Sequence, residues 1–250
     1  MMDYYFEKHF MIGTKDVDQD NHCRPSALLS FLQEAATAAS VALGVSRGDM
    51  LARYNVFWML ARIWFRVERP LHCNEVLTVR TWHRGGRGVS MYRDFDLYVE
   101  GNLVGEAVSN WVLADQVNRK MLRMSHVELD GFMKTGGSLC KTMTLNKLKR
   151  PEKMELAEQR LMHDSETDIN GHVNNARYAD FALDVLYPQA MEGHSFVSDM
   201  QLGYLAECRP GEVLTIHRSQ DGGQYFVRGV GQDEVVRFDA AVTLTSLINT

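Results

Sequence analysis

Three polar residues alternate along a short segment early in the second half of the chain. Asp168, Asn170 and His172 stand at every second position, and side chains two residues apart project to the same side of an extended backbone. Gly171 between them permits an unusual turn. An imidazole such as that of His172 can accept and donate a proton, while Asp168 or Asn170 would orient its neighbours. This pattern predicts acid–base chemistry on one loop.

Two further features belong to this candidate site. A helix is predicted after the loop, with Asn174 or Asn175 as its N-cap, and the unpaired N–H groups of a helix N-terminus suit a carbonyl oxygen that becomes negative. Further along, Glu207 and Cys208 place a carboxylate beside a thiol, and the carboxylate could act as a base toward water. Each residue also has an ordinary structural explanation, because Asp and Asn often only form turns and Cys is often a buried apolar residue.

The elements that must position this loop recur in the first half of the chain. Residues 18–34 resemble residues 168–184 at a fixed offset, so that His22 pairs with His172. In both copies apolar residues recur at i, i+3, i+4 and i+7, which is the pattern of one buried helix face. The match therefore predicts an internal duplication.

A second match assigns the chemistry to the second copy. Residues 69–79 resemble residues 209–216, which pairs Glu68 with Glu207 and leaves no thiol beside Glu68. In the first loop Asp20 also stands at the position of Asn170, so that a carboxylate replaces the amide. We therefore expect one reactive site, in the second half.

Strand-like segments follow the predicted helix in each half. They are joined by short glycine-rich turns, which is typical of antiparallel hairpins. A helix of this kind must bury its apolar stripe against the sheet, so the predicted fold class is α+β, with helices at 25–43 and 174–187. A capping box at 125–128 predicts a short helix between the halves. The predicted strands are 56–67, 77–81, 89–99, 107–113, 196–206, 213–218, 225–230 and 235–247.

The composition argues against several classes of protein. The chain has 250 residues, 45% of them hydrophobic, and a formal net charge of −5, which is ordinary for a folded protein and disfavours a nucleic-acid binder. Four cysteines without a C-x-x-C pair indicate neither a disulfide framework nor a zinc site. The sequence shows no membrane-length apolar run, signal peptide or glycine-rich nucleotide motif. We therefore expect no metal, no cofactor, no membrane span and a cytoplasmic location.

Two motifs connect the chain to a known family. D-I-N-G-H-V-N-N-A-R-Y at 168–178 and Y-L-A-E-C-R-P-G at 204–211 resemble the acyl-carrier-protein (acyl-ACP) thioesterases of plants and bacteria. The resemblance covers essentially the whole chain. It implies a double hotdog fold, in which two tandem repeats each wrap an antiparallel sheet around one long central helix. The implied domains are an acyl-binding hotdog at 1–117, a linker at 118–153 and a catalytic hotdog at 154–250.

The resemblance also implies an activity and its residues. The protein would hydrolyse fatty acyl-ACP to free fatty acid and ACP in fatty acid biosynthesis, as a monomer or homodimer whose partner is the acyl carrier protein. Its catalytic residues would be Asp168, Asn170, His172, Glu207 and Cys208.

An acyl channel and a basic docking surface are expected beside this site. The channel candidates Phe57, Trp58, Leu60, Ile63 and Trp64 could equally be sheet core. A basic cluster would attract an acidic carrier but could also be a solvated linker face. The docking candidates are Lys147, Lys149 and Arg150.

Three alternatives stay open at this stage. The carrier could be coenzyme A, which would make the protein an acyl-CoA thioesterase. The reaction could be the dehydration or hydration that other hotdog enzymes perform, although the loop motif resembles the thioesterases. The protein could also bind acyl chains without catalysis.

The nucleophile also has two candidates. Cys208 with His172 could form an acyl-enzyme, or Glu207 and His172 could activate water. We favour water, because the carboxylate of Glu207 next to Cys208 should raise the pKa of the thiol, whereas a nucleophilic cysteine needs a lowered one.

Overall fold

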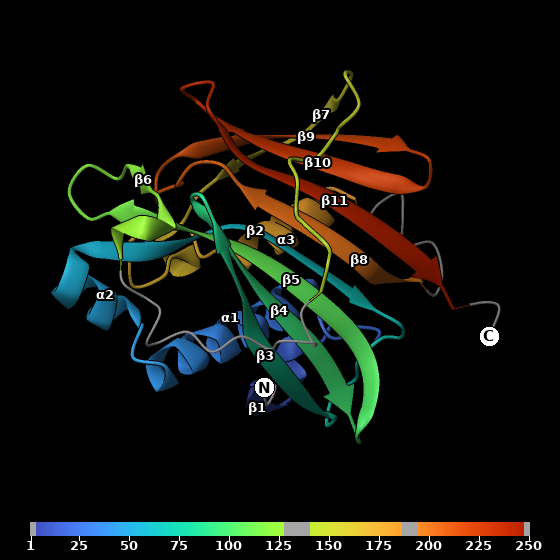
Figure 1. Cartoon of the computed structure of the whole chain (residues 1–250). Coiled ribbons are helices and arrows are strands. Elements are labelled where there is room, and N and C mark those ends of the chain that lie inside the picture. Colours follow the sequence, from blue (N-terminus) through green and yellow to red (C-terminus); the bar gives the residue numbers. More distant parts are fainter. Residues whose placement is uncertain (1–3, 128–140, 187–194, 248–250) are drawn as a thin grey trace. The chain divides into compact units, whose positions relative to one another are not determined.

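The computed structural model describes residues 4–127, 141–186 and 195–247 (Figure 1). Contacts divide the chain into two compact units, the first made of Met1–Gly13, Ser30–Ile63 and Asn74–Leu145, the second of Thr14–Leu29, Trp64–Cys73 and Asn146–Thr250. The chain passes between the units inside a helix and inside a strand, so the units do not coincide with the sequence repeats. The domain boundaries predicted at 1–117, 118–153 and 154–250 describe the repeats and stay a prediction.

The first unit contains an antiparallel sheet of hairpin-connected strands. Its order is β1-β3-β4-β5, followed by this unit's part of β2, with β6 paired to β5. The four strands predicted in this half are confirmed. Their bounds are β2 Val56–Val67, β3 Val76–Arg87, β4 Ser90–Val99 and β5 Asn102–Asp115, with β1 at Phe6–Met11 and β6 at Met121–Leu122.

Helix α1, Pro25–Ala42, has the length and the buried face that its sequence predicts. The chain enters it at Pro25, since proline fits the first turn, where an N–H has no partner within the helix. The ring of Phe31 stacks on Phe10 of β1 with centroids 4.8 Å apart. The stripe residues Leu28, Phe31, Leu32, Ala35 and Ala36 are all buried.

Helix α2, Arg47–Tyr54, was not predicted. It begins at a capping box between Ser46 and Asp49 and ends at Asn55, which has a left-handed φ of 55°. Its buried residue Met50 packs in a cluster with Val45, Val56, Met91, Leu113 and Val127. Ser46 followed three residues later by Asp49 is a signal that the sequence offered for this helix.

The second unit has an antiparallel sheet in the order β8-β11-β10-β9-β7. The strands predicted in this half are confirmed, and β7 is added at the edge. The bounds are β7 Glu155–Leu161, β8 Ser195–Tyr204, β9 Val213–Asp221, β10 Gln224–Gly231 and β11 Val236–Ser246.

Helix α3, Arg177–Asp184, is shorter than predicted. It has 8 residues, whereas the sequence predicted a helix over 174–187 and the resemblance implied one long helix in each repeat. The side-chain oxygen of Asn174 accepts the N–H of Ala176 at 2.9 Å, and this local turn delays the start of the helix. The apolar face is nonetheless buried, as Tyr178, Ala179, Phe181, Ala182 and Leu183 show.

The segment between the repeats differs from its prediction. Residues 124–126 form one 3₁₀ turn and Val127 is extended, with φ −131°, so no α-helix starts at Ser125. Residues 128–140 lie outside the described part of the chain. Residues 141–154 have no regular secondary structure.

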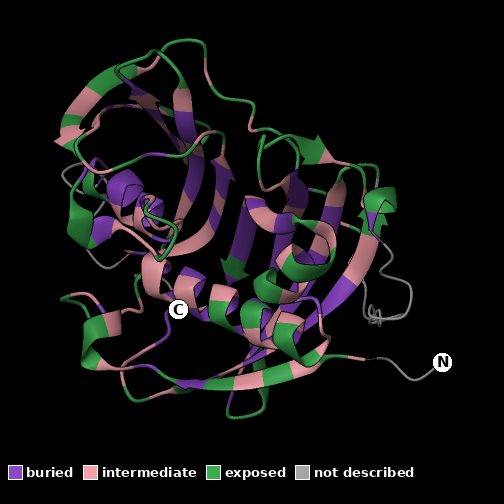
Figure 2. Cartoon of the chain, turned by 90° about the vertical axis from the view of Figure 1, so that its left-hand side faces the viewer, coloured by how far each residue is buried: buried purple, intermediate pink, exposed green. Residues whose placement is uncertain are grey.

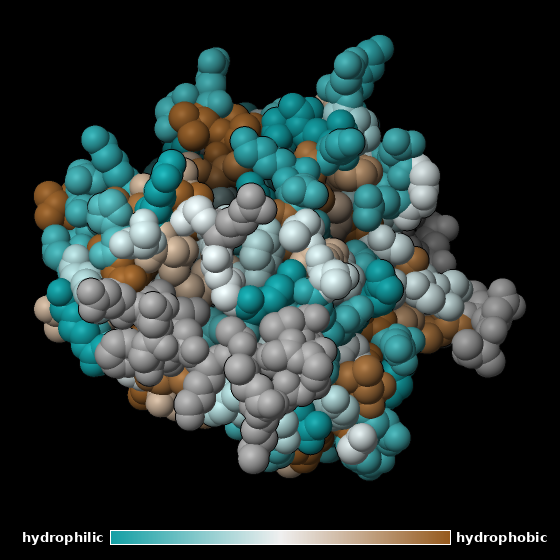
Figure 3. All heavy atoms as spheres, viewed as in Figure 1, coloured by the Kyte–Doolittle hydropathy of each residue, from teal (hydrophilic) through white to brown (hydrophobic). Residues whose placement is uncertain are grey.

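Buried and exposed positions alternate along the strands, as Figure 2 shows in bands. On the face seen in Figure 3, hydrophobic side chains stand in small groups among hydrophilic ones. Among the described residues no single helix is long and apolar enough to cross a membrane, although α1 and α2 taken together as a bent pair have that length and composition.

Candidate active site

The polar loop at 168–172 is closed by its own hydrogen bonds. The N–H of Asp168 donates to the carbonyl of His172 at 2.9 Å, and the N–H of Gly171 donates to the carbonyl of Asp168 at 3.0 Å. Gly171 has a φ of +73°, a conformation that a residue with a Cβ rarely adopts. The loop is therefore a tight turn rather than an extended segment, and its glycine is required for that turn.

Asp168 holds Asn170 within this turn. One carboxylate oxygen accepts the backbone N–H of Asn170 at 2.8 Å, and the other accepts its side-chain amide at 3.2 Å. The amide of Asn170 is exposed to solvent. The contact has the geometry that an orienting role for Asp168 requires.

His172 contacts the carboxylate of Glu207. Its Nε2 lies 3.0 Å from Oε2 of Glu207, with the histidine side chain 14% exposed and the glutamate side chain 40% exposed. A carboxylate beside a ring nitrogen stabilises the protonated imidazole, and a carboxylate that reaches solvent can accept a proton from water. The fold thus brings together two residues that are far apart in the sequence.

Two hydrogen bonds explain why this pair forms. The N–H of Val173 donates to the carbonyl of Cys208 at 2.9 Å, which places the loop beside the segment that follows β8. The hydroxyl of Tyr204 donates to the carbonyl of Asn175 at 3.0 Å. Tyr204 was not predicted as part of the site, because a single tyrosine at a strand end gives no signal of such a tertiary contact.

The N-terminus of α3 follows the loop, but its cap differs from the prediction. Ala176 occupies the N-cap position and makes no side-chain capping bond. The side chain of Asn174, two residues before the N-cap, accepts the N–H of Ala176. The backbone carbonyl of Asn175 accepts the hydroxyl of Tyr204. Neither predicted asparagine is therefore the N-cap of this helix.

Cys208 is separated from solvent and contacts a second carboxylate. It is 1% exposed, and its thiol donates to Oε2 of Glu212 at 3.5 Å. Arg237 in turn donates to the same oxygen of Glu212 at 2.9 Å. Burial, and then the charge of Glu212, raise the pKa of Cys208 to about 11. The direction of this shift matches the prediction, but the carboxylate responsible is Glu212 rather than Glu207.

The first repeat has a loop with the same backbone hydrogen bonds. The N–H of Asp18 donates to the carbonyl of His22 at 2.9 Å, and Asn21, with φ +63°, takes the place of Gly171. A 3₁₀ turn precedes each loop, at Thr14–Asp16 and at Asp164–Glu166. The duplication predicted from the sequence is therefore visible in the local structure of both loops.

Among the described residues, the carboxylate of the pair has no counterpart in the first repeat. The N–H of Cys23 donates to the carbonyl of Leu71 at 2.7 Å, which is equivalent to the loop bond to Cys208 in the second repeat. Leu71 thus stands where Cys208 does, and Pro70 stands where the second repeat has its glutamate. The predicted match with Glu68 is wrong, because the residues that the second copy lacks precede this point of the chain.

The five channel candidates lie on β2 in different surroundings. The guanidinium groups of Arg47 and Arg119 lie over the ring of Phe57, and the indole N–H of Trp58 donates to the carbonyl of Val45 at 3.2 Å. The indole N–H of Trp64, in the second unit, donates to Asp199 at 2.9 Å. The aliphatic pair Leu60 and Ile63 is buried.

The three docking candidates are exposed. Lys147, Lys149 and Arg150 all lie in the stretch without regular secondary structure that precedes β7. Arg150 donates to the carbonyl of Pro151 at 3.2 Å. Their exposure meets a requirement for a docking surface.

Comparisons with known proteins agree with this fold. Models of the N-terminal and C-terminal domains of acyl-ACP thioesterases match residues 3–130 and 151–241. A solved acyl-ACP thioesterase from Bacteroides thetaiotaomicron superposes with a TM-score of 0.79 over 96% of this chain and 98% of that one, at 19% identity. A 12:0-ACP thioesterase from Umbellularia californica gives 0.78 over 96% and 97%, also at 19% identity.

The fold is of the hotdog type, as the resemblance implied. The chain belongs to the acyl-ACP thioesterase family. It is 23% identical over 241 residues to an oleoyl-ACP thioesterase of Arabidopsis thaliana and 25% identical over 222 residues to a palmitoyl-ACP thioesterase of Gossypium hirsutum. These matches cover 87% and 84% of this chain but only 65% and 53% of the relatives, so the chain spans about half to two thirds of their length.

Proposed function

We propose that this protein is a thioester hydrolase that cleaves fatty acyl-ACP to free fatty acid and ACP. The observation that carries the proposal is the 3.0 Å contact between His172 and Glu207, on a loop where Asp168 holds Asn170. A proton acceptor, an imidazole and an amide donor are the groups that attack of water on a thioester requires. Family membership supports acyl-ACP as the substrate.

The proposed reaction uses water as the nucleophile. Glu207 accepts a proton as the water oxygen bonds to the thioester carbonyl carbon, and the amide of Asn170 donates to the oxygen that becomes negative. The C–S bond then breaks, and the leaving thiolate takes its proton from the His172–Glu207 pair. Cys208 has no covalent role in this scheme, because its pKa of about 11 keeps the thiol protonated at neutral pH.

The chain length and the carrier are further parts of the proposal. Leu60 and Ile63 of β2 are the two channel candidates with purely aliphatic side chains, which suits contact with an acyl chain. Lys147, Lys149 and Arg150 supply the basic surface that an acidic carrier protein would meet. The cytoplasmic location stays a prediction from composition.

The test is the release of free fatty acid from a set of acyl-ACP substrates and from the corresponding acyl-CoA substrates. We expect acid from acyl-ACP at a higher kcat/KM than from acyl-CoA of the same chain. Acid from acyl-CoA alone would replace the proposal with the acyl-CoA thioesterase. Binding of acyl-ACP without release of acid would instead make the protein a non-catalytic acyl-binding protein.

A further inference from the structure

Glu207 lies in a short segment of the second unit that connects the end of β8 to the start of β9. The two residues before it, Leu205 and Ala206, donate their N–H groups to the backbone carbonyl of Arg237 at 2.8 and 3.2 Å. Arg237 belongs to β11, so the sheet holds the segment just before Glu207.

The side chain of the same arginine acts on the other end of the segment. Its guanidinium donates to Oε2 of Glu212 from Nη2 at 2.9 Å and from Nε at 3.2 Å. The other oxygen of this carboxylate, Oε1, accepts the N–H of Arg209 at 3.2 Å. Glu207 therefore lies between two points that both depend on Arg237, one through its carbonyl and the other through Glu212.

The guanidinium of Arg237 is itself fixed in one place. Its side chain is 9% exposed, and Asp233 accepts a further bond from Nη2 at 3.1 Å. Hydrogen bonds between charged groups are about twice as strong as neutral ones. A Cβ added to Gly231 would stand 2.6 Å from Nη2 and 2.7 Å from Cζ. The missing side chain of this glycine leaves the space that the guanidinium occupies.

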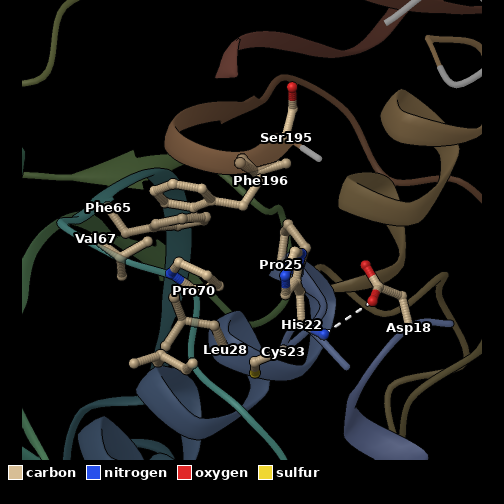
Figure 4. A pocket seen from close by; sticks show the side chains of 12 residues that line it. Asp18, His22, Cys23, Pro25, Leu28, Phe65, Val67, Pro70, Ser195 and Phe196 are labelled. Atoms are coloured by element: carbon tan, nitrogen blue, oxygen red, sulfur yellow. Dashed lines mark hydrogen bonds between the residues drawn. The ribbon is translucent and has the colours of Figure 1, made fainter. Parts of the chain in front are cut away.

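The equivalent position of the first repeat has a different restraint. Pro70 stands there, and the ring of a proline fixes its own φ. Figure 4 shows Pro70 beside the apolar side chains of Phe65 and Leu28, and all three line one small cavity. Glu207 has no such ring, and its side chain is 40% exposed. In the second repeat the restraint therefore comes from contacts outside the segment.

We propose that Arg237 and Glu212 are positioning residues, which keep the carboxylate of Glu207 opposite His172. Neither residue has a step of its own in the reaction. Their effect on hydrolysis therefore rests on the proposed function and passes through Glu207, whereas their effect on the position of the segment does not depend on any substrate.

Arg237→Met tests the effect on hydrolysis. It should lower kcat for acyl-ACP by about 10–100-fold, because a catalytic group misplaced by about 1 Å costs up to about 10²-fold. KM should stay within about twofold, since neither positioning residue is a channel or docking candidate. Arg237→Lys keeps the charge and can still bond to Glu212, so it should recover part of the lost rate. Thermal unfolding shows that each variant is folded at the assay temperature.

The same change in a Glu207→Gln background separates positioning from a general loss of structure. Arg237→Met should cost no more than about twofold there, because the group that it positions has already been removed. A purely structural role would lower the rate by the same factor in both backgrounds, and that result would overturn the proposal.

Two glycine variants move the guanidinium without removing a charge, and they also serve if Arg237→Met does not fold. Gly231→Ala places a methyl group against Nη2 of Arg237 and should lower kcat by about tenfold. Gly203→Ala in β8 is the matched control, because an added Cβ there meets the carbonyl of Asp239 at 3.9 Å, an ordinary contact. Equal rates in these two variants would contradict the role of Arg237.

Amide hydrogen exchange measures the position of the segment without substrate. The N–H of Arg209 donates to Glu212, and the N–H of Val173 donates to the carbonyl of Cys208 at 2.9 Å. Both should exchange about tenfold faster in Arg237→Met, whereas amides in the middle of β10 should not change. Faster exchange in a protein whose wild type releases no fatty acid would support the positioning and reject the proposed function. Unchanged exchange of both amides would overturn the positioning role.

Discussion

Two close contacts, the hydrogen bonds of Asp168 with Asn170 and the 3.0 Å pair of His172 with Glu207, involve four of the five predicted catalytic side chains. The fifth, Cys208, belongs to a different group of residues, with Glu212 and Arg237. Charge in that group favours the protonated thiol, whereas a nucleophilic cysteine needs a thiolate. The proposed hydrolytic pair, His172 and Glu207, and the thiol of Cys208 therefore belong to different groups of interacting residues.

A first prediction concerns Cys208. Cys208→Ala should keep kcat within about tenfold of the wild type, because loss of a true acid–base group costs about 10²–10⁴-fold. The measurement is steady-state release of fatty acid from acyl-ACP. An acyl group trapped on Cys208, together with an inactive Cys208→Ala, would restore the thiol as nucleophile.

The same thiol predicts a pH dependence of stability. The folded state keeps the Cys208 proton up to about pH 11, above the ordinary thiol value of 9.0. The stability that the protonated thiol contributes is therefore complete below pH 9 and is lost as the pH rises toward 11. The free energy of unfolding, measured with urea, should fall over this pH range more in the wild type than in Cys208→Ala. Equal pH profiles would contradict the burial of the thiol.

At this scale the sequence indicates the candidate residues, which stay a prediction, more readily than the residues that support them. The alternating polar residues and the glycine turn were visible in one short motif, because a local turn depends on local residues. Glu212 and Tyr204 act through tertiary contacts, and no spacing in the sequence indicates those. The N-cap was misplaced for a related reason, since Asn174 bonds to the backbone before the helix begins.

At the scale of elements, ion pairs and a backbone hydrogen bond hold Lys141, which follows the first repeat, against the sheet of the first unit. Asp94 is fully buried and accepts the guanidinium of Arg84 and the backbone N–H of Lys141, the latter at 2.8 Å. The amine of Lys141 bonds to Asp96 at 2.7 Å and to Glu106 at 2.8 Å. The linker is thus fixed by three carboxylates on β4 and β5.

This arrangement predicts a large loss of stability for Asp94→Asn. Removing one charge of a buried pair costs about 3–5 kcal/mol, because Arg84 then lacks its counter-charge. The control is Glu34→Gln, which breaks the exposed 3.1 Å pair with Lys8 and should cost about 1 kcal/mol or less. Urea unfolding of both variants measures the difference. Equal effects would mean that Asp94 does not anchor the linker.

Strand β2 carries the prediction on chain length. Leu60→Ala or Ile63→Ala should favour longer acyl chains, since each CH₂ gained or lost in contact changes binding by about 0.8 kcal/mol, or about fourfold. The products of an acyl-ACP mixture are compared by chain length. A lower total rate with an unchanged product profile would mean that these residues are only sheet core.

The elements themselves were largely predictable. The strands and α1 follow apolar periodicities that burial enforces. Helix α2 was not predicted because its apolar stripe is short. The prediction for α3 was too long because the second repeat was assumed to copy α1. Local capping interactions decide helix ends, and the periodicity does not contain them.

At the scale of the whole molecule, duplication explains why one loop could specialise. Both loops keep the same backbone hydrogen bonds, but within the described part of the chain only the second repeat has a glutamate opposite its histidine. The compact units cut across this repeat, which a sequence match cannot reveal, because contacts rather than similarity define them.

The basic cluster gives a prediction about the carrier. Changing Lys147, Lys149 and Arg150 together to Glu should raise KM for acyl-ACP about tenfold and leave KM for acyl-CoA unchanged, because only the carrier protein has an extended acidic surface. Lys15→Glu, an exposed change outside the cluster, is the control. An equal effect on both substrates would contradict docking at this stretch.

The most direct measurement compares the two equivalent histidines. The single variants His172→Ala and Glu207→Gln should each lower release of fatty acid from acyl-ACP by about 10²–10⁴-fold. His22→Ala should keep nearly the wild-type rate, with unchanged thermal stability. Loss of activity on His22→Ala, or retention of activity on His172→Ala and Glu207→Gln, would contradict the assignment of hydrolysis to the second repeat.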